Sequence, residues 1–437
     1  MFRGKCGKFY FFHISLLNLL FCQHCLWRRF SYSPKGLRRF STFFFPTDYC
    51  YELISSPSLQ REKEIGGITM KFSCEKVLLS SAVTVTSRAV AAKSSIPAME
   101  GILIEAGDSL RLTGYNLETG IQAAVPAEIK EKGSLVLSAR LFGEIVRKLP
   151  DDMVVFSSQG YTVNIKCGMS EFNILGTDPE EFPELPTVDQ QNALTLPQPV
   201  LRAMISQTLF AVSDNESRPI HTGSLFEVDG DTLTVVSVDG YRLALRKEGL
   251  TEKKGADLFS FVVPGSALGE VEKICSGEES VTVTQGARHI MFKTGDTVLV
   301  CRRLEGEFLP YKNAIPRNNT IHIEVDARSL LASIERVSLI ISEKLKSPLR
   351  CIFGDGMVSI TTKTAIGDAA DQCLISGDGQ GLEIGFNNKY LMDALKAAPA
   401  DKLRMEFTSG VAPCVILPAE GEENFIYMVL PVRLKAN

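Results

Sequence analysis

Apolar and polar residues alternate in short segments at three places along the chain. These segments cover residues 109–113, 232–236 and 357–361. Strict alternation places the apolar side chains on one face of a strand, so each segment is predicted to be a half-buried β-strand. The copies are evenly spaced, because the matched residues are 123 and 125 positions apart (Leu110, Leu233 and Val358).

A second pattern, typical of amphipathic helices, recurs with the same spacing. It occupies residues 141–149, 267–274 and 390–396, where apolar residues lie three and four positions apart. Its matched residues are 126 and 123 positions apart (Phe142, Leu268 and Leu391). Two independent landmarks therefore give one period of about 120 residues, which is the size of a complete small domain.

Each copy has the same order of predicted elements. A helix opens the copy, a proline follows, strands with Gly, Asp and Asn turns come next, and the amphipathic helix precedes further strands. In the second copy, residues 281–284 and 289–292 flank a Gln-Gly-Ala-Arg turn as a hairpin would. Two helices packed on antiparallel sheet make an α+β fold. The opening helices are predicted at residues 80–93, 197–213 and 327–344, and the prolines are Pro97, Pro219 and Pro348.

Two proline-rich stretches, residues 182–186 and 309–316, separate the copies and suit linkers. The sequence therefore predicts three domains, at residues 70–190, 196–317 and 319–434, preceded by an extension of residues 1–69. Composition also sets this extension apart. It holds 10 Lys+Arg against 4 Asp+Glu, so the formal net charge of −4 divides into +6 on the extension and −10 on the remainder.

Three interpretations of the extension stay open. A targeting signal would place basic residues before the apolar run 9–22, but no small-residue cleavage site follows, and 14 residues are too few to span a bilayer. A zinc site could use Cys22 and Cys25, although a closed structural site needs four ligands. The third is that the segment is non-native or disordered and that Met70 is the true start, because Gly66-Gly67 is what a translated ribosome-binding site would encode.

The remaining cysteines show no paired spacing and lie mostly in apolar, strand-like runs. They are predicted to be small buried side chains in a reducing, cytoplasmic environment. No apolar stretch after residue 69 approaches 18 residues, so no membrane span is predicted there. The seven are Cys74, Cys167, Cys275, Cys301, Cys351, Cys373 and Cys414.

Motifs of familiar enzymes are missing from the sequence. It contains no G-x-x-x-x-G-K-[ST] loop, no H-E-x-x-H and no G-x-S-x-G. The glycine-rich segment 377–381 leads into a strand-like run rather than a helix, which favours a turn over a phosphate-binding loop. The isolated histidines suggest no metal site (His221, His289 and His322). Three equivalent domains without a catalytic cluster indicate a scaffold or a binding ring.

Basic residues recur on the predicted helices of an otherwise acidic chain. Arg140 and Arg147 are seven positions apart and share a helix face beside an apolar stripe of Leu141, Ile145 and Leu149. Recurrence in all three copies favours a polyanion partner that is bound without reading bases, although a solvated face remains the alternative. The other basic residues are Arg88, Lys93, Lys148, Arg202, Lys273, Arg336, Lys344, Lys389 and Lys396.

Several ordered motifs resemble those of one known family. They are Met70-Lys-Phe, Ser95-Ile-Pro, Leu112-Thr-Gly-Tyr-Asn-Leu-Glu, Arg218-Pro, Gly223-Ser-Leu-Phe-Glu, Val238-Asp-Gly-Tyr-Arg-Leu and Tyr427-Met-Val-Leu-Pro-Val-Arg-Leu. Together they resemble the bacterial DNA polymerase III β subunit, the sliding clamp, over residues 70–434. The resemblance implies a head-to-tail homodimeric ring, with helices lining the hole and sheets outside. Such a ring encircles duplex DNA without sequence preference and confers processivity as a non-catalytic subunit of a DNA-directed DNA polymerase holoenzyme. It needs no cofactor or metal.

The resemblance also implies a DNA-contacting set of residues. These are Lys93, Arg140, Asn215, Pro219 and Ile220. Pro219 and Ile220 stand where some clamps have aromatic residues, so base stacking is not expected there.

A second implied site is a groove between the second and third domains. In the family it takes a short peptide, similar to Gln-Leu-x-Leu-Phe, from the polymerase III α subunit, the clamp loader and repair polymerases. An apolar pocket suits the Leu-Phe anchors, and Gly240 lets the peptide backbone approach. His221 replaces an apolar residue common in relatives, and residues 435–437 extend past the usual end. The matching positions are His221, Val238, Gly240, Tyr241, Arg242, Leu243, Leu309, Asn313, Ala314, Val411, Pro413, Met428, Leu430, Pro431, Val432, Arg433 and Leu434.

Two other functions are weighed against the ring. A nucleotidyltransferase or nuclease would need a cluster of carboxylates to hold Mg²⁺, and the sequence shows none that is evident. A monomeric peptide-binding module would use the groove but would never encircle DNA.

Overall fold

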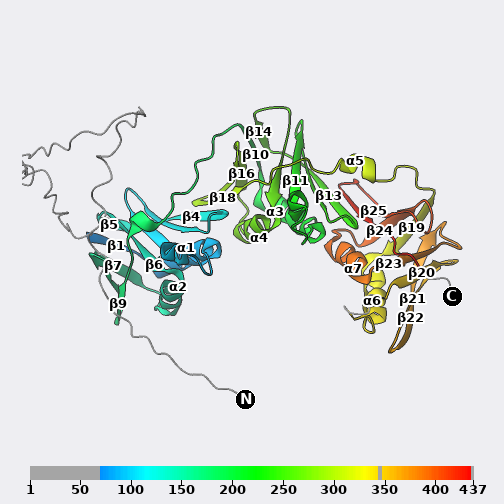
Figure 1. Ribbon diagram of the computed structural model, residues 1–437, viewed down its shortest axis with the longest axis horizontal. Coiled ribbons are helices and arrows are strands. Elements are labelled where there is room, and N and C mark those ends of the chain that lie inside the picture. Colours follow the sequence, from blue (N-terminus) through cyan, green and yellow to red (C-terminus); the bar gives the residue numbers. More distant parts are fainter. Residues whose placement is uncertain (1–68, 343–346, 435–437) are drawn as a thin grey trace, which may run out of the picture. The chain divides into compact units, whose positions relative to one another are not determined.

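The computed structural model describes residues 69–342 and 347–434, and its helices and strands form three successive groups (Figure 1). Each group opens with a strand that runs directly into a helix, and a second helix follows after several strands. The predicted α+β fold with three repeated units is therefore confirmed. The interpretations of the extension concern residues outside the described part of the chain, apart from Thr69, which pairs with Gln159.

The three units contain matching elements. The first has helices α1 (Lys76–Thr86) and α2 (Ala139–Lys148) and strands β1 (Thr69–Glu75), β2 (Gly101–Ala106), β3 (Leu110–Tyr115), β4 (Thr119–Val125), β5 (Glu128–Glu131), β6 (Gly133–Ser138), β7 (Met153–Gln159), β8 (Thr162–Cys167) and β9 (Ser170–Leu175). The second has α3 (Gln198–Ser206), α4 (Gly265–Ile274), β10 (Asn192–Pro197), β11 (Gly223–Asp229), β12 (Thr232–Val238), β13 (Arg242–Gly249), β14 (Glu252–Lys254), β15 (Leu258–Pro264), β16 (Ser280–Gln285), β17 (His289–Thr294) and β18 (Thr297–Arg302). The third has α6 (Ala327–Ser338), α7 (Asn388–Ala397), β19 (Ile321–Asp326), β20 (Leu349–Phe353), β21 (Met357–Thr364), β22 (Gly367–Gly377), β23 (Glu383–Phe386), β24 (Lys402–Phe407), β25 (Cys414–Pro418) and β26 (Phe425–Val429). Short helical segments are η2 (Ser87–Ala89), η3 (Pro97–Glu100), η4 (Pro179–Glu181), η5 (Leu209–Ala211), η6 (Pro219–Thr222) and α5 (Tyr311–Ala314).

Antiparallel pairing arranges the strands into three sheets. Their orders are β5-β1-β7-β8-β9, then β14-β10-β16-β17-β18-β4-β3-β2-β6, and β15-β11-β12-β13-β26-β25-β24-β19-β22-β21-β20-β23. Two of these sheets cross from one unit to the next. β18 of the second unit pairs with β4 of the first, and β13 of the second pairs with β26 of the third. Backbone hydrogen bonds therefore join neighbouring units.

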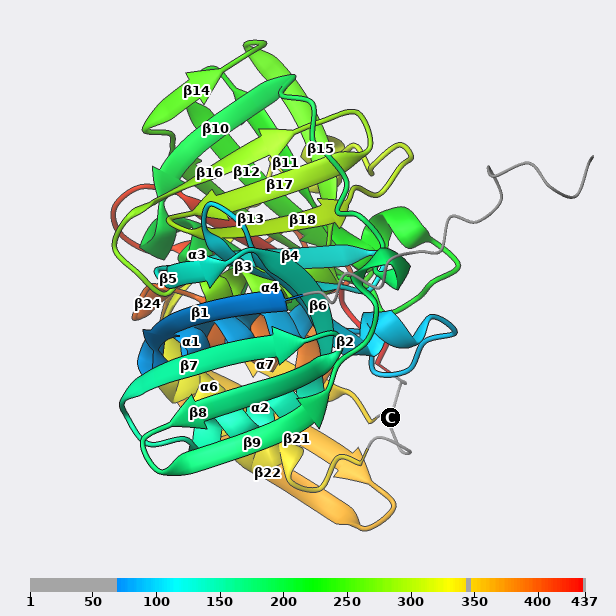
Figure 2. The ribbon, with the colours of Figure 1, turned by 90° about the vertical axis from the view of Figure 1, so that its left-hand side faces the viewer.

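Helix pairs pack against the sheets and form the cores. In Figure 2, β1, β7, β8 and β9 lie side by side in front of α1 and α2. The first core contains Phe72, Phe142 and Phe156, all at most 1% exposed, and the rings of Phe72 and Phe156 stack at a centroid distance of 4.7 Å. Equivalent pairs, α3 with α4 and α6 with α7, are in contact in the other units.

The opening helices are shorter than the sequence predicted. The prediction for residues 80–93 was wrong at both ends, because α1 covers Lys76–Thr86 and is followed by η2. Near its end, the hydroxyls of Thr86 and Ser87 donate to the carbonyls of Ala82 and Val83 and so compete with the helical backbone bonds. The second opening helix also ends early, where Thr208 donates to the carbonyl of Met204.

The apolar face of α2 also differs from the predicted stripe. Phe142, Ile145, Val146 and Leu149 are buried, whereas Leu141 is 45% exposed. Positions 142, 145, 146 and 149 have the spacing of a core-facing helix, so Leu141 is displaced to the solvent side.

Both predicted linkers are packed rather than free. Phe182 is 6% exposed and lies in a small cluster with Tyr115 and Val136. Tyr311 is 4% exposed, and its hydroxyl donates to Glu227 Oε1 at 2.9 Å. Aromatic residues in the connecting segments thus anchor them to the sheets that they cross.

The predicted turns are confirmed. β16 and β17 pair around residues 286–288, where the Gly286 amide donates to the His289 carbonyl at 2.9 Å. The glycine-rich segment forms the connection from β22 to β23, and Gly377 and Gly381 have φ angles of 112° and 85°. These are left-handed conformations that glycine adopts without strain.

The core packing of α2 generates a stability prediction. We expect Phe142→Ala to lower the free energy of unfolding by about 3–5 kcal/mol, because it leaves a cavity between α2 and Phe156. Urea unfolding followed by circular dichroism measures the change. Leu141→Ala, next to it on the exposed side, is the matched control and should cost less than about 1 kcal/mol. Equal losses in the two variants would contradict this assignment of the faces.

Candidate functional site

The motif Val238-Asp-Gly-Tyr-Arg-Leu forms a tight turn between β12 and β13. Asp239 Oδ1 accepts hydrogen bonds from the amides of Tyr241 and Arg242 at 2.8 and 2.9 Å. Gly240 has a φ of 90°, a conformation that costs other residues free energy. The turn buries Val238 and Leu243 and leaves Tyr241 60% exposed.

The C-terminal segment of the third unit runs beside this turn. β26 pairs with β13 so that Leu243 lies opposite Met428 and Arg242 lies opposite Val429. Beyond β26, the Leu430 amide donates to the Tyr241 carbonyl at 2.8 Å. Further along, the Val432 amide donates to the Gly385 carbonyl, which directs the end of the chain along β23.

Several of the predicted groove residues pack together in one apolar cluster. It contains Val238, Leu243 and Met428, with Ala314 and Leu430 packed against it. Its other members include Leu225, Val236, Val262 and Tyr311. Side chains from separate segments therefore pack into one apolar cluster, whose members are buried and at whose edge Ala314 and Leu430 are half-buried.

His221 lies at the edge of this cluster. Its ring packs edge-on against Phe308, which itself packs against the cluster, at a centroid distance of 5.8 Å. Burial, followed by the positive charge of Arg218, lowers the pKa of His221 below its ordinary value. The imidazole is therefore neutral at neutral pH and does not bring a charge to the apolar surface.

The other predicted groove residues are not members of this cluster. Val411 is 85% exposed, and Leu309 and Val432 are 39% and 38% exposed. Asn313 and Arg433 are also exposed. Pro413 directly precedes β25, and Leu434 approaches Gly385 of β23. Pro431 is half-buried between Leu430 and Val432.

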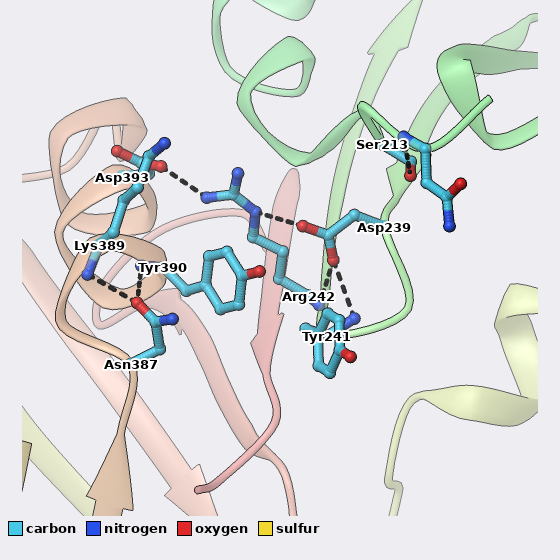
Figure 3. A network of polar contacts seen from close by, with 9 residues as sticks. Ser213, Asp239, Tyr241, Arg242, Asn387, Lys389, Tyr390 and Asp393 are labelled. Carbon is cyan, nitrogen blue, oxygen red and sulfur yellow. Dashed lines mark hydrogen bonds and ion pairs between the residues drawn. The ribbon is translucent and has the colours of Figure 1, made fainter. Parts of the chain in front are cut away.

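A cavity of about 860 Å³ adjoins the turn on the side of α7. Tyr241, Arg242 and Val432 line it, together with Asn387 and Tyr390, which are not among the predicted site residues. Figure 3 shows Tyr390 projecting from the start of α7 toward Tyr241. Asn387 caps α7 by accepting hydrogen bonds from the amides of Lys389 and Tyr390. An Asn-Asn pair before a helical pattern is a helix-start signal, but it does not reveal which surface the helix faces.

The predicted DNA-contacting residues are not grouped in one place. Arg140 is exposed on α2 and forms only a surface ion pair, at 3.4 Å, with Glu144. The prediction that Lys93 ends the first helix is wrong, because Lys93 lies in an exposed bend beyond η2. Asn215 accepts hydrogen bonds within its own loop, and Pro219 opens η6. Ile220 packs against the apolar cluster and so lies nearer the peptide groove.

Acidic residues partly neutralise the basic helix faces. Glu270 on α4 pairs with Lys273 and, across the joint between the first two units, with Arg88. Arg336 pairs with Asp371, and Lys396 pairs with Glu335. Lys344 lies outside the described residues. The helices therefore carry less unpaired positive charge than the sequence pattern suggested.

The predicted burial of the cysteines is confirmed. All seven described cysteines are buried free thiols. Burial raises the pKa of Cys275 to about 11 and that of Cys74, Cys301 and Cys351 to about 12. These thiols are therefore protonated at neutral pH. Among the described residues, no group of three or more His, Cys, Asp or Glu side chains is placed to hold a metal ion.

Three family models of the DNA polymerase III β subunit match successive parts of the chain. They represent its N-terminal, central and C-terminal domains and match residues 70–186, 195–310 and 312–433. The chain belongs to the DNA polymerase III β-subunit family, the β sliding clamps.

Known clamps match over their whole length. The β sliding clamp of Halalkalibacterium halodurans is 33% identical over 379 residues, which cover 83% of this chain and 100% of the relative. That of Staphylococcus aureus is 32% identical over 380 residues, 83% of this chain and 99% of the relative. The crystal structure of the Bacillus subtilis clamp superimposes with a TM-score of 0.80 at 31% identity, over 84% of this chain and 100% of that one. A Pseudomonas aeruginosa clamp bound to griselimycin gives a TM-score of 0.79 at 25% identity and the same coverage.

Membership of this family establishes the function predicted from the resemblance. The chain is a sliding clamp that confers processivity in DNA replication. The comparisons give no support to the catalytic alternative. Within the described residues, no helix is long and apolar enough to cross a membrane.

Proposed function

We propose that two copies of this clamp close head to tail into a ring around duplex DNA and hold partner proteins by short peptides in the groove between the second and third units. The ring has no catalytic activity of its own. The observation that carries the proposal is the apolar cluster in which Val238, Leu243, Ala314, Met428 and Leu430 meet beside the β12–β13 turn. Domain limits at residues 70–190, 196–317 and 319–434, with the second domain extended to residue 192 so that it contains all of β10, and action in the cytoplasm complete the proposal.

Free sheet edges at both ends of the chain support ring closure. β9 is the last strand of its sheet. β22 pairs with β21 along residues 367–374 but with β19 only along residues 375–377, so much of one edge has no partner strand in the described chain. Exposed apolar residues accompany these edges, since Leu175 and Leu374 are each 76% exposed. A head-to-tail dimer would pair such edges and cover such side chains.

The DNA site is proposed to use phosphate contacts. Arg140, whose side chain is 90% exposed, has the clearest access, because its pair with Glu144 is at the surface and contributes little. Lys93 adds a second exposed positive charge. Asn215 and Pro219 lie on an exposed loop, where their contacts would be uncharged. Contacts of this kind are independent of sequence and sensitive to salt, which suits sliding.

The groove is proposed to take the Leu-Phe anchors of a partner segment into the apolar cluster. The proposed partners are the polymerase III α subunit, the clamp loader and repair polymerases. Half-buried Leu430 and Pro431 offer side chains at its surface, while Met428 beneath them is 7% exposed. The neutral His221 extends this surface without introducing charge.

Retention on circular DNA tests directly whether the clamp forms a closed ring around the duplex. The clamp, loaded on a nicked circular plasmid, should stay bound through gel filtration at high salt and should be released when the plasmid is cut. Sedimentation should give twice the chain mass of 48.0 kDa. If the protein is a monomer at micromolar concentration and cutting the plasmid does not change how much protein stays bound, the result would instead support a peptide-binding module that does not encircle DNA.

Arg140→Glu should weaken loading on DNA while sparing peptide binding. The substitution reverses an exposed charge that faces no buried partner, so we expect about a tenfold loss of DNA retention at low salt and no loss of stability. Lys254→Glu makes the same charge change on β14 at the edge of a sheet and is the control. The DNA assignment would be wrong if both variants lost retention equally.

The double substitution Leu430→Ala with Pro431→Ala should have the opposite effect. Removing both side chains takes apolar surface from the groove, so the Kd for a fluorescent Gln-Leu-Ala-Leu-Phe peptide should rise by at least about tenfold. Retention on circular DNA should match that of the unsubstituted clamp. Loss of both activities, accompanied by a lower melting temperature, would indicate misfolding rather than a groove defect.

A further inference from the structure

Arg242 is a charged residue that the joint between the second and third units almost completely buries. It is 8% exposed, although an unpaired charge in such a place would be strongly destabilising. Two carboxylates balance the positive charge of Arg242. Asp239, in the same turn, accepts from Arg242 Nε at 2.9 Å, and Asp393, on α7 of the third unit, accepts from Nη1 at 2.6 Å.

The same guanidinium also contacts aromatic rings from both units. Its central carbon lies 4.6 Å from the ring centroid of Tyr390 on α7 and 5.4 Å from that of Phe210 in η5. Cations over aromatic faces are attracted to the ring electrons. Tyr390 in turn stacks on Tyr241 at a centroid distance of 5.9 Å and an interplanar angle of 21°. Figure 3 shows the guanidinium between Asp239 and Asp393, with Tyr390 beside it.

The stacked tyrosines belong to different units and form part of one cavity wall. Tyr241 is in the β12–β13 turn, Tyr390 is on α7, and both line the cavity of about 860 Å³ beside the apolar cluster. The Asp239–Arg242–Asp393 bridge links the turn to the helix directly behind this pair. The position of this aromatic wall therefore depends on the hydrogen bonds of Arg242 to Asp239 and Asp393 as well as on backbone pairing.

We propose that Asp393 is a positioning residue for partner peptides, which holds Tyr390 against Tyr241 through Arg242 and so places the aromatic wall beside the groove. The inference rests on the proposed peptide-binding function and adds to it a residue that does not touch the peptide. Loss of Asp393 leaves the joint itself in place, because β13 and β26 stay paired and α7 still packs against η5. The expected defect is therefore a misplaced aromatic wall in a folded clamp.

Two substitutions and a control on the same helix separate this role from general damage. Asp393→Ala removes both the charge and the acceptor, whereas Asp393→Asn keeps an acceptor and most of the side-chain shape. Lys396→Ala breaks the pair between Lys396 and Glu335 on the far part of α7 and makes no change at Arg242. All are measured in the full chain, with the fluorescent Gln-Leu-Ala-Leu-Phe peptide as the probe.

We expect Asp393→Ala to raise the peptide Kd about tenfold, Asp393→Asn to raise it less, and Lys396→Ala to leave it unchanged. Retention on circular DNA should stay the same in Asp393→Ala and Asp393→Asn. In a Tyr241→Ala background, Asp393→Ala should add little, because the ring against which the bridge holds Tyr390 is already gone.

Three outcomes would count against the inference. An unchanged Kd in Asp393→Ala, with normal binding by the unsubstituted clamp, would overturn it while leaving the proposed function intact. Fully additive losses in the Tyr241→Ala background would also overturn it, since they would show that Asp393 does not act through the aromatic pair. Failure of the unsubstituted clamp to bind the peptide would overturn the proposed groove function, and this inference with it.

Discussion

Backbone pairing between strands of neighbouring units is the interaction on which the rest of the structure depends. β18 pairs with β4 over five residue pairs, and β13 pairs with β26 over five more. A strand register cannot shift by one residue without turning every side chain to the opposite face, so each joint is defined at the level of single residues. The opposition of Leu243 and Met428, and with it the apolar cluster, follows from the register of the second joint.

The two joints share this pairing but differ in the side chains that reinforce it. At the first, Ile121 of β4 enters the core of the second unit, and Arg88 forms a partly exposed pair with Glu270. At the second, Arg242 is buried between two carboxylates and two aromatic rings. A buried charge gains little over an apolar packing of the same volume, but it demands specific partners. Arg242 therefore helps to fix the position of the β12–β13 turn relative to α7 beside the groove.

Periodicity in the sequence predicted the repeated units and the β16–β17 hairpin, because each is encoded by local spacing, whereas the groove residues were implied only by the resemblance of motifs to a known family. It failed where the outcome depends on distant contacts. Leu141 was predicted to be a core residue, but Phe142 occupies the core and Leu141 is exposed. Lys93 was predicted to be helical, but α1 ends earlier, where side-chain hydroxyls bond to its last carbonyls. No sequence pattern predicted a role for Asp393 or Tyr390. Their role depends on contacts with Arg242, which lies 151 positions before Asp393 in the sequence.

The same contrast applies to charge. An acidic chain can still bind DNA if its positive side chains are exposed where the duplex passes. Ion pairs such as Lys396 with Glu335 reduce the number of positive side chains that are free to contact phosphates. Each additional phosphate contact strengthens binding and steepens its dependence on salt. In the proposed ring, linkage rather than affinity would retain the clamp, so partial neutralisation by Glu270 and Glu335 would favour movement along DNA over tight attachment.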